Sequence, residues 1–119
     1  MLGTELVSLA VEAAASKTSD PTVVIEVGDL LAITEHFVIT SGSNDRQVRA
    51  IAEEIERRLK TAGGGGPRTV EGLDDARWVL MDYGDFVVHV FVEEARRFYD
   101  LERLWGDAPR LQVGLGAKA

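Results

Sequence analysis

Two periodicities of apolar and polar residues along this chain, helical and β-like, predict three helices and five strands. Near the amino end, apolar residues recur every three to four positions, which is the spacing of one helical face. This stripe predicts a helix from Leu2 to about Ser16. Asp20-Pro21 ends that segment, because the residue before a proline avoids the helical conformation. The stripe consists of Leu2, Leu6, Leu9, Ala10 and Ala13.

Two short β-branched stretches follow and predict strands. One runs from Thr22 to Val27 and is ended by Gly28. The other is Phe37-Val38-Ile39-Thr40, whose unbroken apolar character predicts a central strand. Ser41-Gly42-Ser43-Asn44 is its predicted turn.

The clearest helix of the chain comes next. Asn44 and Gln47 have the spacing of a capping box, in which each side chain satisfies a free amide at the helix start. Gly63 to Pro67 ends the helix. Its predicted buried stripe is Val48, Ile51, Ala52, Ile55 and Leu59, and its predicted ion pairs are Glu53 with Arg57 and Glu54 with Arg58.

The second half predicts a hairpin followed by a helix. Arg68 to Glu71 is a short edge strand, and Trp78 to Tyr83 and Phe86 to Val92 are strong strands around a Gly84-Asp85 turn of type II′. Glu93 to Trp105 is expected to be one helix, with Phe98, Leu101 and Trp105 on one stripe. The predicted fold is therefore α/β, a single domain of residues 1–109 with a mixed sheet and flanking helices, followed by a flexible tail at 110–119.

The tight turn fixes which hairpin residues face each other. One face carries mainly apolar side chains and belongs on the core. The other, which we call the mixed face, carries Trp78, Leu80, Asp82, Val87, His89 and Phe91. Two interpretations remain open for it: the last helix covers it, or it is a partner surface, since large aromatics with few charges are typical of interface centres.

Composition narrows the classes of function. The formal net charge is −7, which disfavours non-specific nucleic-acid binding and favours a basic protein partner, although it also simply confers solubility. The chain has no cysteine, no apolar run long enough to span a bilayer and no signal-peptide pattern, so we expect a cytoplasmic location.

Little in the sequence indicates catalysis. The two histidines, His36 and His89, do not have metal-ligand spacing. Gly42-Ser43, between a strand and a helix, is similar to the start of a nucleotidyltransferase site, but no Asp-x-Asp pair follows on the next strand. We therefore predict no enzyme activity, no metal and no cofactor, with a metal-dependent nucleotidyltransferase as the alternative.

A long pattern of residues resembles the ribosomal silencing factor (Iojap) family. It includes Glu71-Gly72, the whole hairpin from Trp78 to Phe91, and then Glu94, Arg96-Arg97, Tyr99, Leu101-Glu102 and Leu104-Trp105. In the first half, residues 37–43 and 47–52 also match the family. The resemblance covers roughly Leu2 to Pro109. One departure is Glu35-His36, where the family often has Asp-Tyr.

The resemblance implies a nucleotidyltransferase-like fold without its catalytic carboxylates. It also implies a function: binding the L-fourteen protein at the intersubunit face of the large ribosomal subunit, which sterically blocks subunit joining and lowers translation during starvation or stationary phase. The binding positions carried over are Trp78, Leu80, Asp82, His89 and Phe91 on the hairpin and Arg97, Tyr99 and Glu102 on the last helix. A homodimer that pairs through the mixed face is a further expectation.

Overall fold

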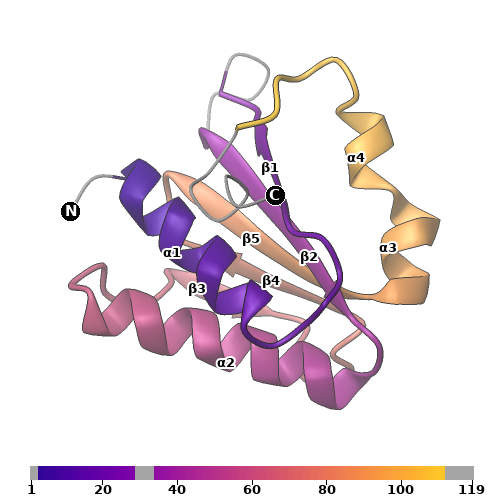
Figure 1. The fold of residues 1–119 in the computed structure, drawn as a ribbon, viewed down its shortest axis with the longest axis horizontal. Helices are drawn as coiled ribbons and strands as arrows, with labels where there is room; N and C mark the ends of the chain where they lie inside the picture. The colour runs from indigo at the N-terminus through magenta and orange to yellow at the C-terminus, as the bar shows by residue number, and fades with distance from the viewer. Residues whose placement is uncertain (1–2, 29–33, 112–119) are drawn as a thin grey trace.

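A five-stranded mixed sheet with helices on both faces forms the core of this protein (Figure 1). The computed structural model describes residues 3–28 and 34–111. The strand order is β1-β2-β5-β4-β3, so the hairpin strand β5 lies at the centre. The elements are α1 (Gly3–Ala15), β1 (Val23–Glu26), β2 (His36–Gly42), α2 (Asp45–Thr61), β3 (Thr69–Glu71), β4 (Trp78–Asp82), β5 (Phe86–Val92), α3 (Glu93–Tyr99) and α4 (Leu101–Leu104).

The predicted α/β class and mixed sheet are confirmed. β2 pairs in parallel with β5, from His36 opposite Phe86 to Gly42 opposite Val92, and the other pairs of the described strands are antiparallel. The likeness to nucleotidyltransferases remains a prediction.

Helices α1 and α2 lie side by side against one face of the sheet, which we call the inner face (Figure 1). The predicted stripe of α2 is buried in full. The stripe of α1 is rotated from its predicted position: Ala10 and Ala13 are buried as expected, whereas Leu6 and Leu9 only flank the core. Val7, Val11 and Ala14 are buried instead. Leu2, the first residue of the predicted stripe, lies outside the described residues.

The start of α2 differs from the predicted capping box by one residue. Asn44 Oδ1 accepts from the Gln47 amide at 2.8 Å, as predicted. The Gln47 side chain, however, accepts from the amide of Ser43 at 2.6 Å, not from that of Asn44. Further along, Glu54 pairs with both Arg57 and Arg58 at 2.6 Å, so the predicted Glu54–Arg58 pair is present while Arg57 turns to Glu54 and not to Glu53.

The predicted last helix is broken into two. Asp100 takes the left-handed conformation with φ 48°, which ends α3 and starts the short α4. Phe98, predicted on the buried stripe, is 79% exposed, because the buried position of α3 is Ala95. A single helix from Glu93 to Trp105 was therefore a wrong prediction.

The chain continues beyond α4 to the outer edge of β1. Glu26 donates its amide to the carbonyl of Pro109, and Leu111 donates to the carbonyl of Val24. Arg110, which we expected in a tail, forms an antiparallel bridge with Ile25. The exposed edge of β1 is therefore covered by the chain itself. Residues 112–119, the remainder of the predicted tail, lie outside the described residues.

A half-covered sheet face as the candidate functional site

The outer face of the sheet, opposite α1 and α2, carries the mixed face of the hairpin. The predicted hairpin register is confirmed residue by residue, from Trp78 opposite Phe91 to Asp82 opposite Val87. Gly84 has the positive φ that a type II′ turn needs at its first central position. The parallel register adds Phe37, Ile39 and Ser41 of β2 to this face, beside Val87, His89 and Phe91.

The carboxyl-terminal segment covers half of this face. Trp105 packs edge-on against Phe37 with ring centroids 5.9 Å apart, and Tyr99 of α3 lies 6.3 Å from Phe91. As a result Phe91 is 0% exposed and His89 is 4% exposed. The interpretation that the whole mixed face is open to a partner is therefore wrong at these two positions, because α3 and the residues after it pack over them.

The other half of the mixed face stays accessible. Trp78, Leu80, Asp82 and Val87 are all half-buried, and α3 touches this group at Trp78, through Tyr99. We call these four residues the docking face. They present an indole, two aliphatic groups and one carboxylate, and Asp82 additionally accepts from the amide of Gly84 at 2.8 Å, which holds the turn.

Trp78 links the docking face to the covered half. Its ring lies 4.6 Å from that of Tyr99 and 4.9 Å from that of Phe91. Its indole Nε1 donates a hydrogen bond to Nδ1 of His89 at 3.1 Å. The indole is thus held by two aromatic rings and one directional bond, so it is presented in a defined orientation.

Burial keeps His89 neutral. Removal of the ring from water lowers the pKa of His89 from 6.5 to about 4. Because an indole can only donate, Nδ1 of His89 must accept, and the ring proton is therefore on Nε2. Nε2 is itself buried and has no hydrogen-bond partner among the described residues.

A buried arginine holds the covering segment in place. Arg96 of α3 pairs with both carboxylate oxygens of Glu102, at 2.9 and 3.1 Å, across the break between α3 and α4. Its remaining nitrogen donates to the carbonyl of Pro21 and to Oγ of Ser41. Ser41 in turn donates to Asp20, whose hydrogen bond with Glu93 raises the pKa of Glu93. This network joins α3 and α4 to β2 and to the chain before β1.

Comparison with known proteins decides the family. A family model described as "Ribosomal silencing factor during starvation" matches residues 3–118. The chain belongs to the ribosomal silencing factor family. The ribosomal silencing factor RsfS of Halalkalibacterium halodurans is 41% identical over 113 residues, which are 95% of this chain and 96% of that protein.

Solved structures agree with the RsfS fold described above. A crystal structure of a protein from Chromobacterium violaceum superposes with a TM-score of 0.83 at 34% identity, covering 96% of this chain and 95% of that one.

A more distant relative is the mouse protein named "Mitochondrial assembly of ribosomal large subunit protein 1", which is 33% identical over 85 residues, or 69% of this chain and 37% of that protein.

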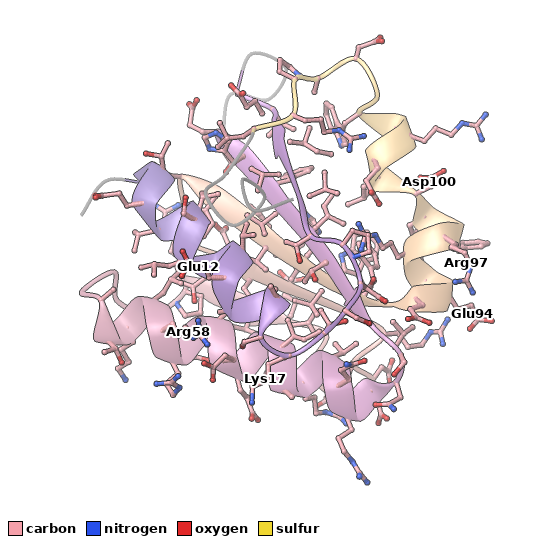
Figure 2. The ribbon with its side chains drawn as sticks, viewed as in Figure 1. Glu12, Lys17, Arg58, Glu94, Arg97 and Asp100 are labelled. Carbon is pink, nitrogen blue, oxygen red and sulfur yellow. The ribbon has the colours of Figure 1, made fainter. Side chains whose placement is uncertain are left out.

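In this RsfS chain the three site residues predicted on the last helix have three different environments. Arg97 is exposed at the outer side of α3 and points away from the sheet (Figure 2). Tyr99 is 49% exposed and borders the docking face through its contact with Trp78. Glu102 is engaged by Arg96, so its role is to hold α4. Only Tyr99 is thus brought next to the docking face.

Sequence reasoning missed two features of this RsfS site. The Arg96 network was not foreseen, because Arg96 reaches Pro21 and Ser41, which are distant in sequence. The exposed residues Phe98 and Leu104, 79% and 71% exposed, were also missed, because the predicted stripe placed Phe98 on the buried side. The left-handed residue between them, Asp100, carries no unambiguous signal in the sequence, although Asp tolerates that conformation better than most residues.

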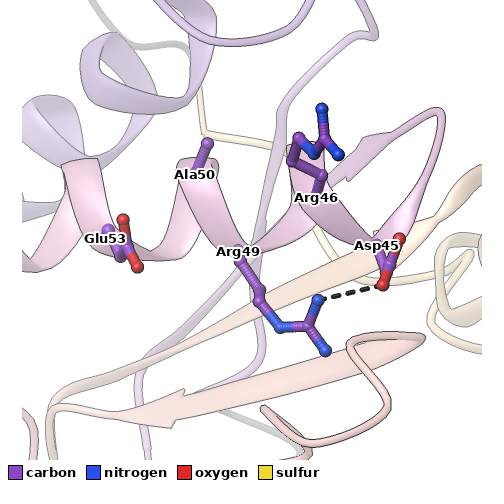
Figure 3. Close-up of a pocket in the computed structure, with 5 residues that line it drawn as sticks. All are labelled: Asp45, Arg46, Arg49, Ala50 and Glu53. Atoms are coloured by element: carbon purple, nitrogen blue, oxygen red, sulfur yellow. Dashed lines mark hydrogen bonds and ion pairs between the residues drawn. The ribbon is translucent and has the colours of Figure 1, made fainter.

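The remaining hollows of the surface offer less chemistry. One of about 440 Å³ is lined by Asp45, Arg46, Arg49, Ala50 and Glu53 on the exposed side of α2 (Figure 3). Arg49 is bound there by Asp45 at 2.9 Å and by the carbonyls of Leu73 and Asp74, so it fastens the loop between β3 and β4.

The Gly42-Ser43 loop does not present a free anion cradle. The Gln47 side chain lies against Gly42 and accepts from both the amide and the hydroxyl of Ser43.

In residues 3–28 and 34–111, no three His, Cys, Asp or Glu side chains are grouped to hold a metal ion. Over the same residues, the helices are too short or too polar to cross a membrane.

Proposed function

We propose that this protein docks on the large ribosomal subunit through the docking face and thereby keeps the small subunit from joining. The contacted component is the L-fourteen protein at the intersubunit face. The observation that carries this proposal is that the carboxyl-terminal segment covers only half of an aromatic sheet face. Trp78 remains partly accessible beside Leu80 and Val87.

The composition of the docking face supports a protein partner. Trp and Tyr are enriched among the residues that dominate binding energy, and each is most effective when a rigid support fixes it. Here Trp78 and Tyr99 support each other, and Leu80 and Val87 add apolar area beside them. The net charge of −7 adds long-range attraction to a basic partner, which accelerates encounter more than it strengthens the complex.

Occlusion needs no covalent chemistry. The protein measures 33 × 31 × 31 Å along its principal axes, so a molecule anchored at a subunit rim occupies a substantial gap. An interface of about 800 Å² on each partner is typical of specific complexes. The effect on translation would follow from stoichiometric binding, in agreement with the family description of silencing during starvation.

Co-sedimentation with purified ribosomal subunits tests the proposal. We expect the protein to sediment with the large subunit and not with the small one, and to reduce joining when it is added first. A pull-down with the isolated L-fourteen protein tests the partner itself. Sedimentation with neither subunit would contradict docking, and large-subunit binding without L-fourteen binding would move the contact to another component.

The name of the mouse relative points to a second role, in assembly of the large subunit. Docking on the same surface of a maturing particle would serve that role as well. Sucrose-gradient profiles of cells that lack the protein distinguish the two roles. Accumulated precursors of the large subunit indicate assembly, whereas an excess of joined ribosomes under starvation indicates silencing.

A second copy of the chain is an alternative occupant of the docking face. Exposed apolar groups often self-associate, and a homodimer built on this face would compete with the ribosome. Light scattering over a range of concentrations detects it. A dimer that dissociates on addition of the L-fourteen protein would indicate one shared surface.

A further inference from the structure

His89 is placed where a partner cannot touch it. The family resemblance assigns this residue to the binding surface, yet its side chain is 4% exposed. It lies beneath Trp78, with Phe37 at 4.6 Å on another side and Phe91 stacked at 6.2 Å. Any contribution of His89 to docking must therefore act through a neighbouring residue.

A histidine is a costly residue for this position. Nε2 carries the ring proton, is buried and has no acceptor among the described residues. A buried donor without a partner costs about 1–3 kcal/mol, so an apolar side chain of similar size would fill the position with less loss. The stability of the fold therefore does not explain why a histidine stands here. Besides filling space, the imidazole contributes a hydrogen-bond acceptor at Nδ1.

That acceptor selects between two orientations of Trp78 that the aromatic contacts alone allow. Contacts with Tyr99 and Phe91 restrain the plane of the indole, but a half-turn about its Cβ–Cγ bond keeps that plane and exchanges the two edges of the ring. A hydrogen bond is directional and weakens steeply when it is misaligned. The 3.1 Å bond from Nε1 to Nδ1 therefore sets which edge of the indole faces inward and which edge faces the partner.

We propose that His89 is a positioning residue that orients the Trp78 indole for docking, without contacting the partner itself. This inference rests on the proposed function of the docking face. The histidine supplies a neutral acceptor at the floor of the site, and the indole it holds is the part that the partner meets.

The surroundings keep that acceptor available. From β4, Asp82 is turned to the amide of Gly84. From α3, Tyr99 packs against Trp78 with the two rings tilted by 44°, and Arg96 is bound by Glu102. β2 contributes Phe37 and Ile39, and the segment after α4 contributes Trp105, none of which is charged. Burial is the cause of the lowered pKa of His89, so the imidazole stays neutral at neutral pH.

Three variants separate positioning from packing. His89→Phe keeps an aromatic ring but removes the acceptor. His89→Asn keeps an acceptor, because its Oδ1 is attached to Cγ as Nδ1 is in histidine. Trp78→Phe removes the donor. Each variant is first checked for a cooperative thermal transition, and binding to the large subunit is then measured on folded protein at neutral pH.

We expect His89→Phe to weaken binding about threefold to tenfold, which is what the loss of one neutral hydrogen bond produces. His89→Asn should remain within about twofold of the unmodified protein. The double variant Trp78→Phe/His89→Phe should bind as well as whichever single variant binds less tightly, because both changes remove the same hydrogen bond. Additive effects would overturn the proposal.

Nuclear magnetic resonance of the isolated protein tests the bond without any ribosome. The chain has two tryptophans, so two indole N–H signals are expected, and Trp105 serves as the internal control. The Trp78 signal should shift and exchange faster with water in His89→Phe but not in His89→Asn. Long-range nitrogen spectra should show His89 protonated at Nε2, and protonation at Nδ1 would overturn the proposal.

These readouts keep the two hypotheses apart. If the unmodified protein does not bind the large subunit, the proposed function fails, whatever the spectra show. If it binds and His89→Phe binds equally well, the docking function stands and the positioning role of His89 is wrong. Lower thermal stability with unchanged binding of the folded protein would likewise assign His89 a purely structural role.

Discussion

Arg96 and Glu102 face each other across the left-handed residue Asp100 and form a two-point ion pair at 2.9 and 3.1 Å. The pair joins α3 to α4 within the segment that packs over the covered half of the mixed face. The Arg96 side chain is only 11% exposed, and it also satisfies Pro21 and Ser41. The segment that borders the docking face is thus anchored by polar contacts to the chain before β1 and to β2.

Arg96→Met should destabilise the protein by about 2 kcal/mol, because it leaves Glu102 and the carbonyl of Pro21 without their partner in a partly dry site. The neighbouring Arg97 is exposed, so Arg97→Met should change stability by less than about 0.5 kcal/mol. Urea denaturation of both variants gives the comparison. Equal effects would show that the Arg96–Glu102 ion pair does not hold α3 and α4 together.

Tyr99 and Phe98 are adjacent but differ in their relation to the docking face. Tyr99 packs on Trp78 at 4.6 Å, whereas Phe98 is 79% exposed and contacts Tyr99 from the side. Tyr99→Ala should therefore weaken binding to the large subunit by about tenfold or more, as loss of a central aromatic does. Phe98→Ala should have a clearly smaller effect. The reverse order in co-sedimentation would place the interface on the outer side of α3.

Leu80 tests the docking face directly. Leu80→Glu introduces a like charge beside Asp82 at a partly accessible strand position, so the fold should survive while docking on an apolar patch is lost. The matched control is Leu73→Glu in the loop fastened by Arg49, where the leucine is 44% exposed. Binding lost equally in both variants would point to net charge, and not to the docking face, as the cause.

The buried imidazole makes stability depend on pH. The pKa of His89 is about 4 in the folded protein and 6.5 in its ordinary state, so between these values the unfolded chain binds the proton and the folded one does not. Stability should thus fall as the pH falls from 6.5 to 4, by about 2–3 kcal/mol from this group.

His89→Phe removes this contribution. In urea denaturation at pH 7 and pH 4.5, the variant should lose about 2–3 kcal/mol less than the unmodified protein. An unchanged pH dependence in the variant would mean that His89 is solvated or paired in solution. The same pair of measurements on Leu73→Glu controls for a general effect of substitution.

The hairpin was predictable because its determinants are local. A glycine-first turn of two residues fixes the register, and alternation then assigns every side chain to a face, so the pairing of Trp78 with Phe91 follows from the sequence. The capping of α2 by Asn44 is local in the same way. Its one-residue error arose because the Gln47 side chain reached the Ser43 amide, which periodicity does not reveal.

The coverage of the mixed face was not predictable by the same reasoning. It depends on the direction of the chain after Tyr99, which the conformation of Asp100 sets. On both sides of Asp100 the chain is held by Arg96, which binds Glu102 and also Pro21 and Ser41, far away in sequence. Local periodicity favoured a straight helix, and the non-local polar network overrode it. The roles of His89 and Phe91 changed with that outcome, from surface groups to supports.

The central position of β5 has a consequence for how the protein is made. Gly42 pairs with Val92, about fifty residues later, so β2 leaves the ribosome long before the strand that it pairs with in parallel exists. Until β5 emerges, β2 can pair only with β1, so the apolar side chains that β5 would cover stay exposed. Truncated products that end before Val92 should therefore be degraded, which links the supply of this protein to complete rounds of synthesis.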